Sequence, residues 1–393
     1  MALTEKGLIA LNHIKTYFPT GAFSAKDLSE VCGEKIAAAT LNGVVNHGYL
    51  IKIGGSPVQF EAVPDLIELL ENVEAAGKNG QDNTKMAAAK RDKNDEFYTR
   101  YEDIEAEAMK YRRQFRGKVV YLPCDDPAEK KSEFWSFFVN NFDAFGLKKL
   151  IATHYDESGK AYKIWIDGDT GNDGYIDDSD ALQEDLIGNG DFRSPECIDI
   201  LNECDIVCTN PPFSLYREFF DTIMQANKLF LVICPQNAFK YKNIFPYVKE
   251  DKVWAGYSFN KTFDFIMADD YALTGTGYID DQGRKHGKVA GTCWMTNMPV
   301  NKRTEEMILT KKYNPIDYPK FDTYDAINVG RVERIPCDYD GIMGVPISFL
   351  GKHNPNQFEI IGEANHGSDN EYDLFKPVIN GKEIFPRILI RKK

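Results

Sequence analysis

The feature that most constrains the fold is the segment Asn210-Pro-Pro-Phe213, which directly follows the short apolar run Ile206–Thr209. Two consecutive prolines cannot donate hydrogen bonds to a sheet, so they end a strand and fix a rigid turn. Ser214 can then cap a helix that carries Phe219 and Phe220. The sequence therefore predicts a strand, a stiff turn and a helix, with an amide, a carbonyl and an aromatic ring at the strand's carboxyl end. Ligands of open α/β sheets bind at that edge.

This turn suits chemistry on a planar amine, such as the exocyclic amino group of a nucleobase. The side-chain oxygen of Asn210 and the carbonyl of Pro211 can each accept one N–H, which turns the nitrogen lone pair outward. Phe213 can stack on a base that has left its duplex. The alternative is a proline turn in which Phe213 is simply packed, but the matching strand and helix favour the functional interpretation. The predicted catalytic residues are Asn210, Pro211, Pro212 and Phe213.

Strand and helix patterns alternate along much of the chain. Buried-strand patterns occupy residues 119–122, 149–154, 206–209 and 228–234, and helical patterns occupy residues 101–115, 132–145 and 195–202. Such a β-α-β alternation predicts an α/β fold in which a mostly parallel, twisted sheet carries helices on its faces. Further strands are predicted at residues 162–166 and near Tyr175 (an inserted hairpin) and at 252–254, 263–268, 289–297 and 385–390.

Residues 1–74 are predicted to form a separate small domain. Three helical patterns precede two alternating segments, 49–53 and 58–63, which surround a Gly-Gly-Ser-Pro turn. Three helices followed by a hairpin predict a winged-helix-like fold, which often places its third helix on DNA. The third helical pattern, 34–47, carries little positive charge, so contact with DNA and contact with a protein partner both remain open. Residues 75–95, rich in Gly, Asn, Lys and Ala, are predicted to form a linker.

The composition narrows the classes of function. The 393 residues carry a formal net charge of −13, which argues against a protein that coats nucleic acid but not against an enzyme with one basic face. We expect no membrane span and no secretion signal. The eight cysteines include no Cys-x-x-Cys pair, which indicates reduced thiols, a cytoplasmic protein and no zinc site. The acidic spacing from Asp169 to Asp180 resembles a calcium loop, but Gly171 occupies a ligand position, so we expect a solvated hairpin without metal.

Three turns are predicted to meet at the carboxyl edge of the parallel strands: Pro123–Pro127, Tyr155-Asp156 and Asn210–Phe213. A ligand with a ribose and an adenine ring needs a carboxylate for the ribose hydroxyls and a flat apolar neighbour there. Asp156 and Asp191 are candidate carboxylates and Phe192 a candidate neighbour, although each acid can instead cap a turn. The chain has no G-x-G-x-x-G and no P-loop, which disfavours a pyrophosphate ligand. Carboxylates near the site fit a cationic sulfonium ligand better than they would fit a pyrophosphate.

Five stretches, together with the Asn210 turn, resemble one known family. They are Asn94-Asp-Glu-Phe-Tyr-Thr99, Val119-Val-Tyr-Leu-Pro-Cys-Asp-Asp-Pro127, Leu150-Ile-Ala-Thr153, Gly190-Asp-Phe-Arg-Ser194 and Asp338-Tyr-Asp-Gly-Ile-Met-Gly-Val-Pro346. In this order, from about residue 94 to the C-terminus, they resemble the EcoRI-type adenine-specific DNA methyltransferase family. The resemblance implies a Rossmann-like class I methyltransferase core over residues 96–300 and S-adenosylmethionine as methyl donor. It also implies a flipped adenine N6 in double-stranded DNA as acceptor, in a restriction-modification context.

The remaining predictions concern cofactor and target contacts. The predicted cofactor-binding residues are Phe97, Tyr98, Thr99, Pro123, Cys124, Asp125, Asp126, Tyr155, Asp156, Asp191 and Phe192. The loop Cys124–Asp126 departs from the wider methyltransferase class, because it lacks the usual glycines. We expect residues 301–393 to help recognise the target, with Gly341–Pro346 either approaching DNA or supporting the sheet. Two alternatives remain, a methyltransferase of protein glutamine amides and a DNA-binding regulator with an inactive methyltransferase body.

Overall fold

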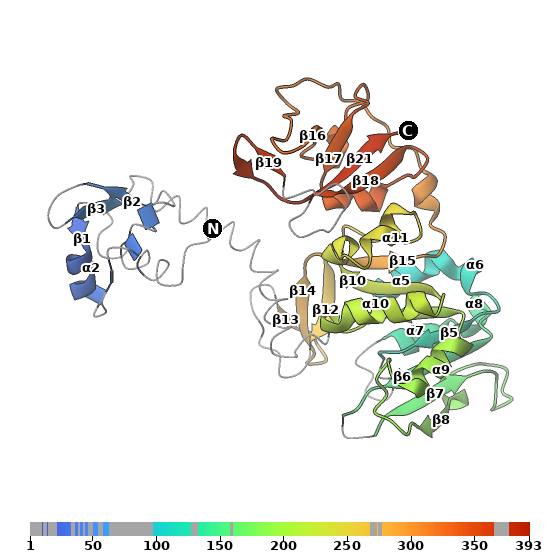
Figure 1. Ribbon diagram of the computed structural model, residues 1–393. Helices are drawn as coiled ribbons and strands as arrows, with labels where there is room; N and C mark the ends of the chain where they lie inside the picture. Colours follow the sequence, from blue (N-terminus) through green and yellow to red (C-terminus); the bar gives the residue numbers. More distant parts are fainter. Residues whose placement is uncertain are drawn as a thin grey trace. The chain divides into compact units, whose positions relative to one another are not determined.

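In the computed structural model, the protein divides into two compact units, Met1–Ala88 and Ala89–Lys393 (Figure 1). In the second unit the structure describes residues 97–125, 127, 133–157, 160–267, 273, 277–364 and 377–393. In the first unit it describes residues 10, 14, 22–32, 36–37, 40–41, 44–45, 50–53 and 58–62. Each unit is described by itself, and the predicted boundaries at residues 74, 95 and 300 stay predictions.

The first unit contains a three-stranded antiparallel sheet in the order β1-β3-β2. Its elements are β1 (Phe23–Ser24), α2 (Ala25–Cys32), β2 (Leu50–Lys52) and β3 (Gln59–Ala62). Ser24 and Asp27 cap α2 reciprocally, each side chain accepting the other's backbone N–H. The β2–β3 pairing confirms the predicted hairpin. The predicted first and third helices lie largely outside the described residues, so the winged helix stays a prediction.

An eight-stranded mixed sheet forms the centre of the second unit, in the order β11-β15-β10-β9-β5-β6-β7-β8. Its strands are β5 (Val119–Leu122), β6 (Lys149–His154), β7 (Tyr162–Ile166), β8 (Leu182–Asp185), β9 (Ile206–Thr209), β10 (Leu229–Pro235), β11 (Trp254–Ala255) and β15 (Thr292–Thr296). Only the four central strands, β6, β5, β9 and β10, are parallel to one another. Both flanks are antiparallel, so the predicted mostly parallel sheet is limited to this centre.

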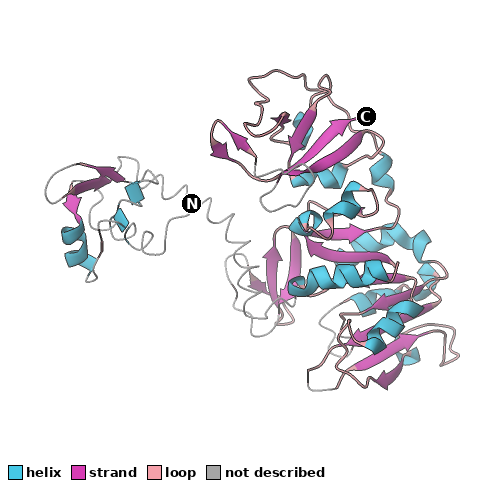
Figure 2. Ribbon diagram, viewed as in Figure 1, coloured by secondary structure: helices cyan, strands magenta, loops and turns pink. Residues whose placement is uncertain are grey.

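Helices cover the large sheet, whose strands lie between them in Figure 2. The α-helices are α5 (Tyr101–Ala108), α6 (Arg112–Phe115), α7 (Phe134–Asn140), α8 (Phe142–Phe145), α9 (Pro195–Glu203), α10 (Tyr216–Gln225) and α11 (Phe245–Lys249). The 3-10 turns are η1 (Met109–Tyr111), η2 (Asp178–Asp180), η3 (Phe213–Leu215), η4 (Gln236–Lys240), η5 (Asn301–Thr304), η6 (Val332–Arg334) and η7 (Ile347–Lys352). Apolar residues of α9 and α10 pack on alternate residues of the central strands, such as Val207 and Val232.

The predicted capping role of Ser214 is wrong. Ser214 lies inside η3, and the residue before α10 is Leu215, whose side chain makes no capping hydrogen bond. The N–H of Leu215 instead donates to the carbonyl of Pro212 (3.0 Å), so a tight 3-10 turn carries the chain from the prolines into the helix.

A separate four-stranded antiparallel sheet, in the order β13-β14-β12-β4, contains the strand predicted at residues 263–268, but strands β4, β13 and β14 were not predicted. It consists of β4 (Phe97–Tyr98), β12 (Phe263–Met267), β13 (Tyr278–Ile279) and β14 (Lys285–Val289). Met267 pairs with Phe97 and Ile266 with Tyr98, so β12 holds a segment far away in the sequence. The rings of Phe97 and Phe265 lie 5.7 Å apart between centroids and extend this contact on the apolar face.

The C-terminal region forms a third sheet, in the order β16-β17-β21-β18, with a small hairpin of β19 and β20. The strands are β16 (Ala326–Asn328), β17 (Ile342–Val345), β18 (Phe358–Ala364), β19 (Val378–Ile379), β20 (Lys382–Glu383) and β21 (Arg387–Lys392). Met343 and Val345 join the same apolar cluster as residues of α10. Gly341–Pro346 is therefore mostly a buried strand, which supports the sheet rather than forming a loop that approaches DNA.

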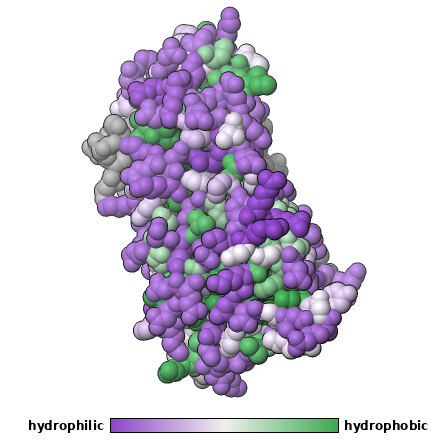
Figure 3. All heavy atoms as spheres, turned by 90° about the vertical axis from the view of Figure 1, so that its right-hand side faces the viewer, coloured by the Kyte–Doolittle hydropathy of each residue, from purple (hydrophilic) through white to green (hydrophobic). Residues whose placement is uncertain are grey.

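The inserted hairpin differs from its prediction in one strand. Tyr162–Ile166 forms β7 as expected, but its partner is β8, and Tyr175 lies exposed in the loop between them. Asp180 accepts the N–H groups of Thr170 and Gly171, so these acids shape the loop through backbone hydrogen bonds. On the face shown in Figure 3, hydrophilic residues predominate and hydrophobic ones form scattered areas. Among the described helices, none is long and apolar enough to cross a bilayer.

Candidate active site

The ends of the four parallel strands bring the predicted turns to one edge. Leu122 of β5 pairs with Ala152 of β6, and Tyr121 of β5 pairs with Val207 of β9. Because these strands are parallel neighbours, the turns that follow them leave the sheet on the same side. The segments that begin at Pro123, Tyr155 and Asn210 therefore share this edge, as the sequence predicted.

The side chain of Asn210 is fixed by a residue 113 positions earlier in the chain. Its Nδ2 donates to the carbonyl oxygen of Phe97 (2.5 Å). A carbonyl can only accept a hydrogen bond, so this contact orients the amide and sends Oδ1 to the other side. Oδ1 is buried and has no hydrogen-bond partner within the part of the chain that the structure describes. A buried acceptor without a partner costs stability, which points to a ligand that supplies the donor.

Phe213 and Pro211 are both buried behind this amide. The ring of Phe213 is 2% exposed and lies edge-on to the ring of Phe97, with the centroids 5.8 Å apart. Phe213 therefore supports Phe97 in this structure. The predicted stacking of Phe213 on a nucleobase requires the ring to become accessible, and it stays a prediction.

Residues 97–99 border the same turn. Tyr98 is half-buried, whereas Thr99 is completely buried. The carbonyl of Thr99 accepts the N–H of Glu133 (3.2 Å), which precedes α7. Thr99 Oγ1 is a second buried polar atom that lacks a hydrogen-bond partner among the described residues. Asn210 and Thr99, which the sequence assigns to catalysis and cofactor binding, therefore each carry such an atom.

The loop after β5 is held by side chains of neighbouring elements. Thr153 of β6 donates to the carbonyl of Pro123 (3.4 Å) and also contacts the hydroxyl of Tyr121 (2.8 Å). Asp125 is buried, and its Oδ2 accepts the N–H of Trp135 (2.8 Å) at the start of α7. Burial raises the pKa of the Cys124 thiol, so this side chain is a neutral thiol at neutral pH. Asp126 lies outside the described residues.

The Gly190 loop folds directly onto the end of β6. Gly190 has φ +75°, and a Cβ at this position would lie 2.2 Å from the carbonyl oxygen of His154. The N–H of Asp156 donates to the carbonyl of Asn189 (3.0 Å). These contacts place Asp191 beside Tyr155-Asp156, as the cofactor prediction required, and only glycine fits the close approach.

Asp191 and Phe192 have well-defined partners within the loop. Asp191 accepts hydrogen bonds from the backbone N–H (2.8 Å), Nε (2.9 Å) and Nη2 (2.7 Å) of Arg193. These bonds hold the pKa of Asp191 below its usual value, so the carboxylate is charged at neutral pH. Phe192 is 7% exposed and packs edge-on against Phe219 of α10. Tyr155 is the most exposed of the predicted residues that the structure describes, at 44%.

Three contributions to the site were missed in the sequence. They are the carbonyl of Phe97 as partner of Asn210, Thr153 as a support of the Pro123 turn, and Arg193 as partner of Asp191. Arg193 had a signal, because it lies two residues after an acid in a glycine-containing loop. The Phe97 carbonyl had none, because a backbone group carries no mark in the sequence.

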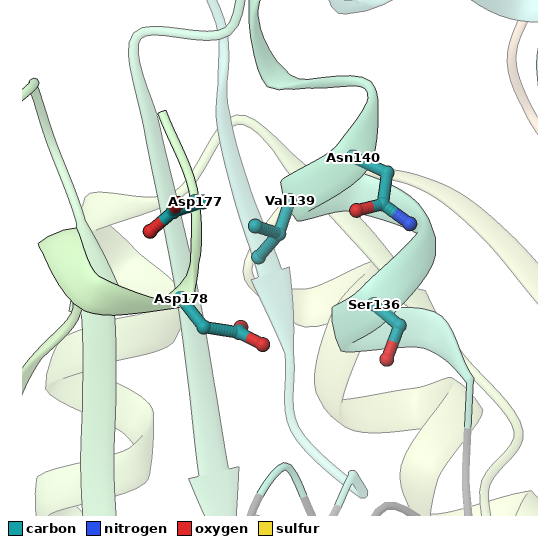
Figure 4. A pocket seen from close by; sticks show the side chains of 5 residues that line it. All are labelled: Ser136, Val139, Asn140, Asp177 and Asp178. Carbon is teal, nitrogen blue, oxygen red and sulfur yellow. The ribbon is translucent and has the colours of Figure 1, made fainter. Parts of the chain in front are cut away.

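A pocket of about 340 Å³ lies away from these residues, between α7 and η2. Figure 4 shows Ser136, Val139 and Asn140 of α7 opposite Asp177 and Asp178. Asp178 accepts the indole N–H of Trp135 (2.9 Å) and so connects the two walls. None of the predicted site residues lines this pocket.

Comparison with known proteins identifies the family. The family model described as "Adenine-specific methyltransferase EcoRI" matches residues 85–393. The chain belongs to the EcoRI-type adenine-specific methyltransferase family. Its activity as an adenine-specific DNA methyltransferase, which the resemblance implied, is thereby confirmed. The family match begins at residue 85, so most of the first unit lies outside the part shared with the family.

Relatives of this EcoRI-type methyltransferase cover most of the chain. Type II methyltransferase M.EcoRI of Escherichia coli is 43% identical over 323 residues, which are 79% of this chain and 97% of the relative. Type II methyltransferase M.MgeORF184P of Mycoplasma genitalium is 38% identical over 78% of this chain and 98% of its own length. Type II methyltransferase M.MpnI of Mycoplasma pneumoniae is 40% identical over 70% of this chain and 83% of its own length.

Proposed function

We propose that the protein transfers a methyl group from S-adenosylmethionine to the N6 amine of an adenine that has been flipped out of double-stranded DNA. The observation that carries this proposal is the orientation of Asn210. Its amide nitrogen is tied to the Phe97 carbonyl, while its oxygen is buried and has no partner in the described part of the chain. An exocyclic amine supplies the N–H donor that this oxygen lacks.

Asn210 and Pro211 would act on the amine together. The lone pair of an adenine amine is delocalised into the ring, which makes the nitrogen a poor nucleophile. If Asn210 Oδ1 and the Pro211 carbonyl each accept one N–H, the nitrogen becomes more tetrahedral and its lone pair points away from both acceptors. The adjoining prolines limit the motion of the two acceptors, so little reorganisation is needed. No strong general base is required before the attack, because the amine loses its proton only after it is methylated.

Several residues at the edge suit S-adenosylmethionine. When bound, this cofactor supplies an electrophilic methyl group on a sulfonium. The charged carboxylate of Asp191 suits ribose hydroxyls and a cationic ligand, and Asp156 lies beside it. The buried Thr99 Oγ1, which has no hydrogen-bond partner in the described part of the chain, can hydrogen-bond a polar group of the ligand. Asp125 already accepts the backbone N–H of Trp135 at the start of α7 through one oxygen. We therefore assign Asp125 a smaller part in cofactor binding than Asp191.

Target recognition is assigned to the region after residue 300. This region has its own sheet, and Lys311, Lys312, Arg331 and Arg334 are exposed on its connecting segments. Exposed cations in a DNA-modifying enzyme provide contacts to phosphates, and base reading needs neighbouring side chains that reach a groove. Gly341–Pro346 is left out of this assignment, because it forms the buried strand β17. The first unit is a candidate for a further contact with DNA or with a protein partner.

The test is to incubate the protein with labelled S-adenosylmethionine and unmodified DNA, hydrolyse the DNA and identify the labelled nucleoside. The expected product is N6-methyladenine, with no label in DNA isolated after exhaustive prior modification by the same enzyme. Label in N4-methylcytosine would contradict the assignment of the base. Label in protein glutamine instead of DNA would contradict the assignment of the substrate.

A further inference from the structure

We propose that Arg217, stacked on Tyr241, binds a backbone phosphate of the DNA strand that carries the target adenine. The inference rests on the proposed function and adds a substrate-contacting residue to it.

Arg217 stands at the same edge as the catalytic turn. It lies in the first turn of α10, which directly follows η3 and so begins where β9 ends. Tyr241 directly follows η4, which begins where β10, the parallel neighbour of β9, ends. The two helices that follow, α10 and α11, lie side by side, with the rings of Phe220 and Tyr247 5.6 Å apart. Arg217 and Tyr241 therefore lie beside the edge where the flipped base is expected.

Tyr241 holds the guanidinium of Arg217 in place without using its hydrogen-bond donors. The central carbon of the guanidinium lies 4.5 Å from the centroid of the Tyr241 ring. Tyr241 is half-buried, whereas Arg217 is exposed. Stacking uses the face of the guanidinium and leaves its N–H groups free around the rim. Such a planar fork matches two oxygens of a phosphate.

Among the residues that the structure describes, no carboxylate pairs with the positive charge of Arg217. Asp221 lies one helical turn further, at the spacing that usually forms an ion pair. However, Asp221 Oδ1 accepts the side-chain N–H of Asn243 (2.9 Å), and Arg217 forms no ion pair with any described residue. A cation in the first turn of a helix also opposes the helix dipole. Apart from its stack on Tyr241, Arg217 therefore gains little from its own fold, which is expected of a side chain that serves an anionic ligand.

Two anions of the proposed reaction are candidates for this site. One is a DNA phosphate, and the other is the carboxylate of the cofactor's amino-acid part. The geometry favours the phosphate, because Arg217 is exposed and lies on the helix after the catalytic turn, whereas the cofactor residues lie around β4, β5 and β6. Arg193, a second cation near this edge, is held by Asp191. Arg217 is the better candidate for an external anion.

The test compares Arg217→Ala, Arg217→Lys and the matched control Arg113→Ala. Arg113 is an exposed arginine of α6, which precedes β5 and therefore lies at the opposite, amino edge of the sheet. DNA affinity is measured for the full chain between about 50 and 200 mM salt, with a duplex that the wild type methylates. S-adenosylmethionine affinity is measured in parallel, and a thermal melt checks that each variant is folded.

Arg217→Ala is expected to weaken DNA binding about tenfold and to reduce the slope of log affinity against log salt by about 0.9. The loss should be the same for DNA with and without the target site, since a phosphate contact carries no sequence information. Arg217→Lys should keep the wild-type slope but bind less tightly, because lysine retains the charge and loses the planar fork. Arg113→Ala should match the wild type, and cofactor affinity should not change.

An unchanged slope for Arg217→Ala would overturn the proposal, even if affinity fell, because the effect would then come from packing on Tyr241. Loss of cofactor affinity instead of DNA affinity would show that the anion is the cofactor's carboxylate. These outcomes are distinct from a failure of the proposed function, in which the wild type itself would not methylate the duplex.

Discussion

Replacing Asn210 by alanine should remove most catalysis while cofactor binding is retained. The substitution deletes the buried Oδ1 acceptor, which has no partner among the described residues and which we assign to the adenine amine. Loss of one preorganised electrostatic contact of this kind lowers kcat by about 10²–10³, or about 2.7–4 kcal/mol. It also removes the hydrogen bond from Asn210 to the Phe97 carbonyl, which contributes about 0.5–1.5 kcal/mol to folding stability. Single-turnover methylation with labelled S-adenosylmethionine at saturating DNA isolates the chemical step from these binding effects.

Asn210→Asp provides a sharper version of the same experiment. An ionised carboxylate would place an oxygen against the Phe97 carbonyl oxygen, where the amide nitrogen now donates at 2.5 Å. This repulsion and the surrounding burial raise the pKa of the new carboxyl group. When protonated, the group can donate to Phe97 and still present an acceptor, so it imitates asparagine. The activity of Asn210→Asp relative to wild type should therefore rise as the pH falls, whereas Asn210→Ala should show no such recovery.

Two results would refute this account of Asn210. One is an Asn210→Ala rate within about tenfold of the wild type in the single-turnover assay, since the acceptor would then contribute far less than a preorganised contact does. The other is an Asn210→Asp to wild-type ratio that stays constant with pH. That result would mean that the Phe97 carbonyl does not control which group faces the substrate.

Three further predictions follow from individual contacts. Gly190→Ala should cost at least about 2 kcal/mol, because it adds a Cβ at positive φ and 2.2 Å from the His154 oxygen; an unchanged thermal midpoint would contradict this. Asp191→Ala should weaken S-adenosylmethionine binding about tenfold in a calorimetric titration but change stability by less than about 1 kcal/mol, because its partner Arg193 is exposed and water screens the pair; equal affinity would refute the ribose assignment. Burial raises the pKa of Glu363 to about 7, so ionising this side chain destabilises the folded state by about 3 kcal/mol. This destabilisation is absent below the pKa that Glu363 has in the unfolded chain, and it is complete above pH 7. Glu363→Gln should thus be more stable than wild type in urea at pH 8.5 and equal to it at pH 4; the same difference at both pH values would contradict the reasoning.

The central part of the fold could be predicted because its strands are short, buried and bounded by turn residues. Residues 119–122, 149–154 and 206–209 have the predicted bounds. The meeting of the turns after these strands at the carboxyl edge could also be predicted, because parallel pairing places the ends of adjacent strands together. The turn at Asn210–Phe213 was visible for the same reason, because two prolines mark the end of a strand.

The parts that could not be predicted depend on contacts distant in sequence or on weak local signals. Strand β4 has two residues, too few to show any periodicity, and it exists because β12 pairs with it. Strand β14, Lys285–Val289, is rich in charge and glycine and carries little β signal. Ser214 has the chemistry of a helix cap, but the preceding prolines force a 3-10 turn that places it inside η3. In each case tertiary structure or backbone geometry overrode a local preference.

The dependence of β4 on β12 also limits when the enzyme can become active during synthesis. Phe97 and Tyr98 leave the ribosome early, but their sheet partners, Ile266 and Met267, are made only after the catalytic turn has already been translated. Until then no ladder fixes the Phe97 carbonyl, and nothing orients the Asn210 amide. A nascent or truncated chain that stops before β12 can form the central parallel strands, yet it should remain unable to modify DNA. With Asn210 in its proposed role, the long-range strand pair links methylation to completion of the chain as far as β12.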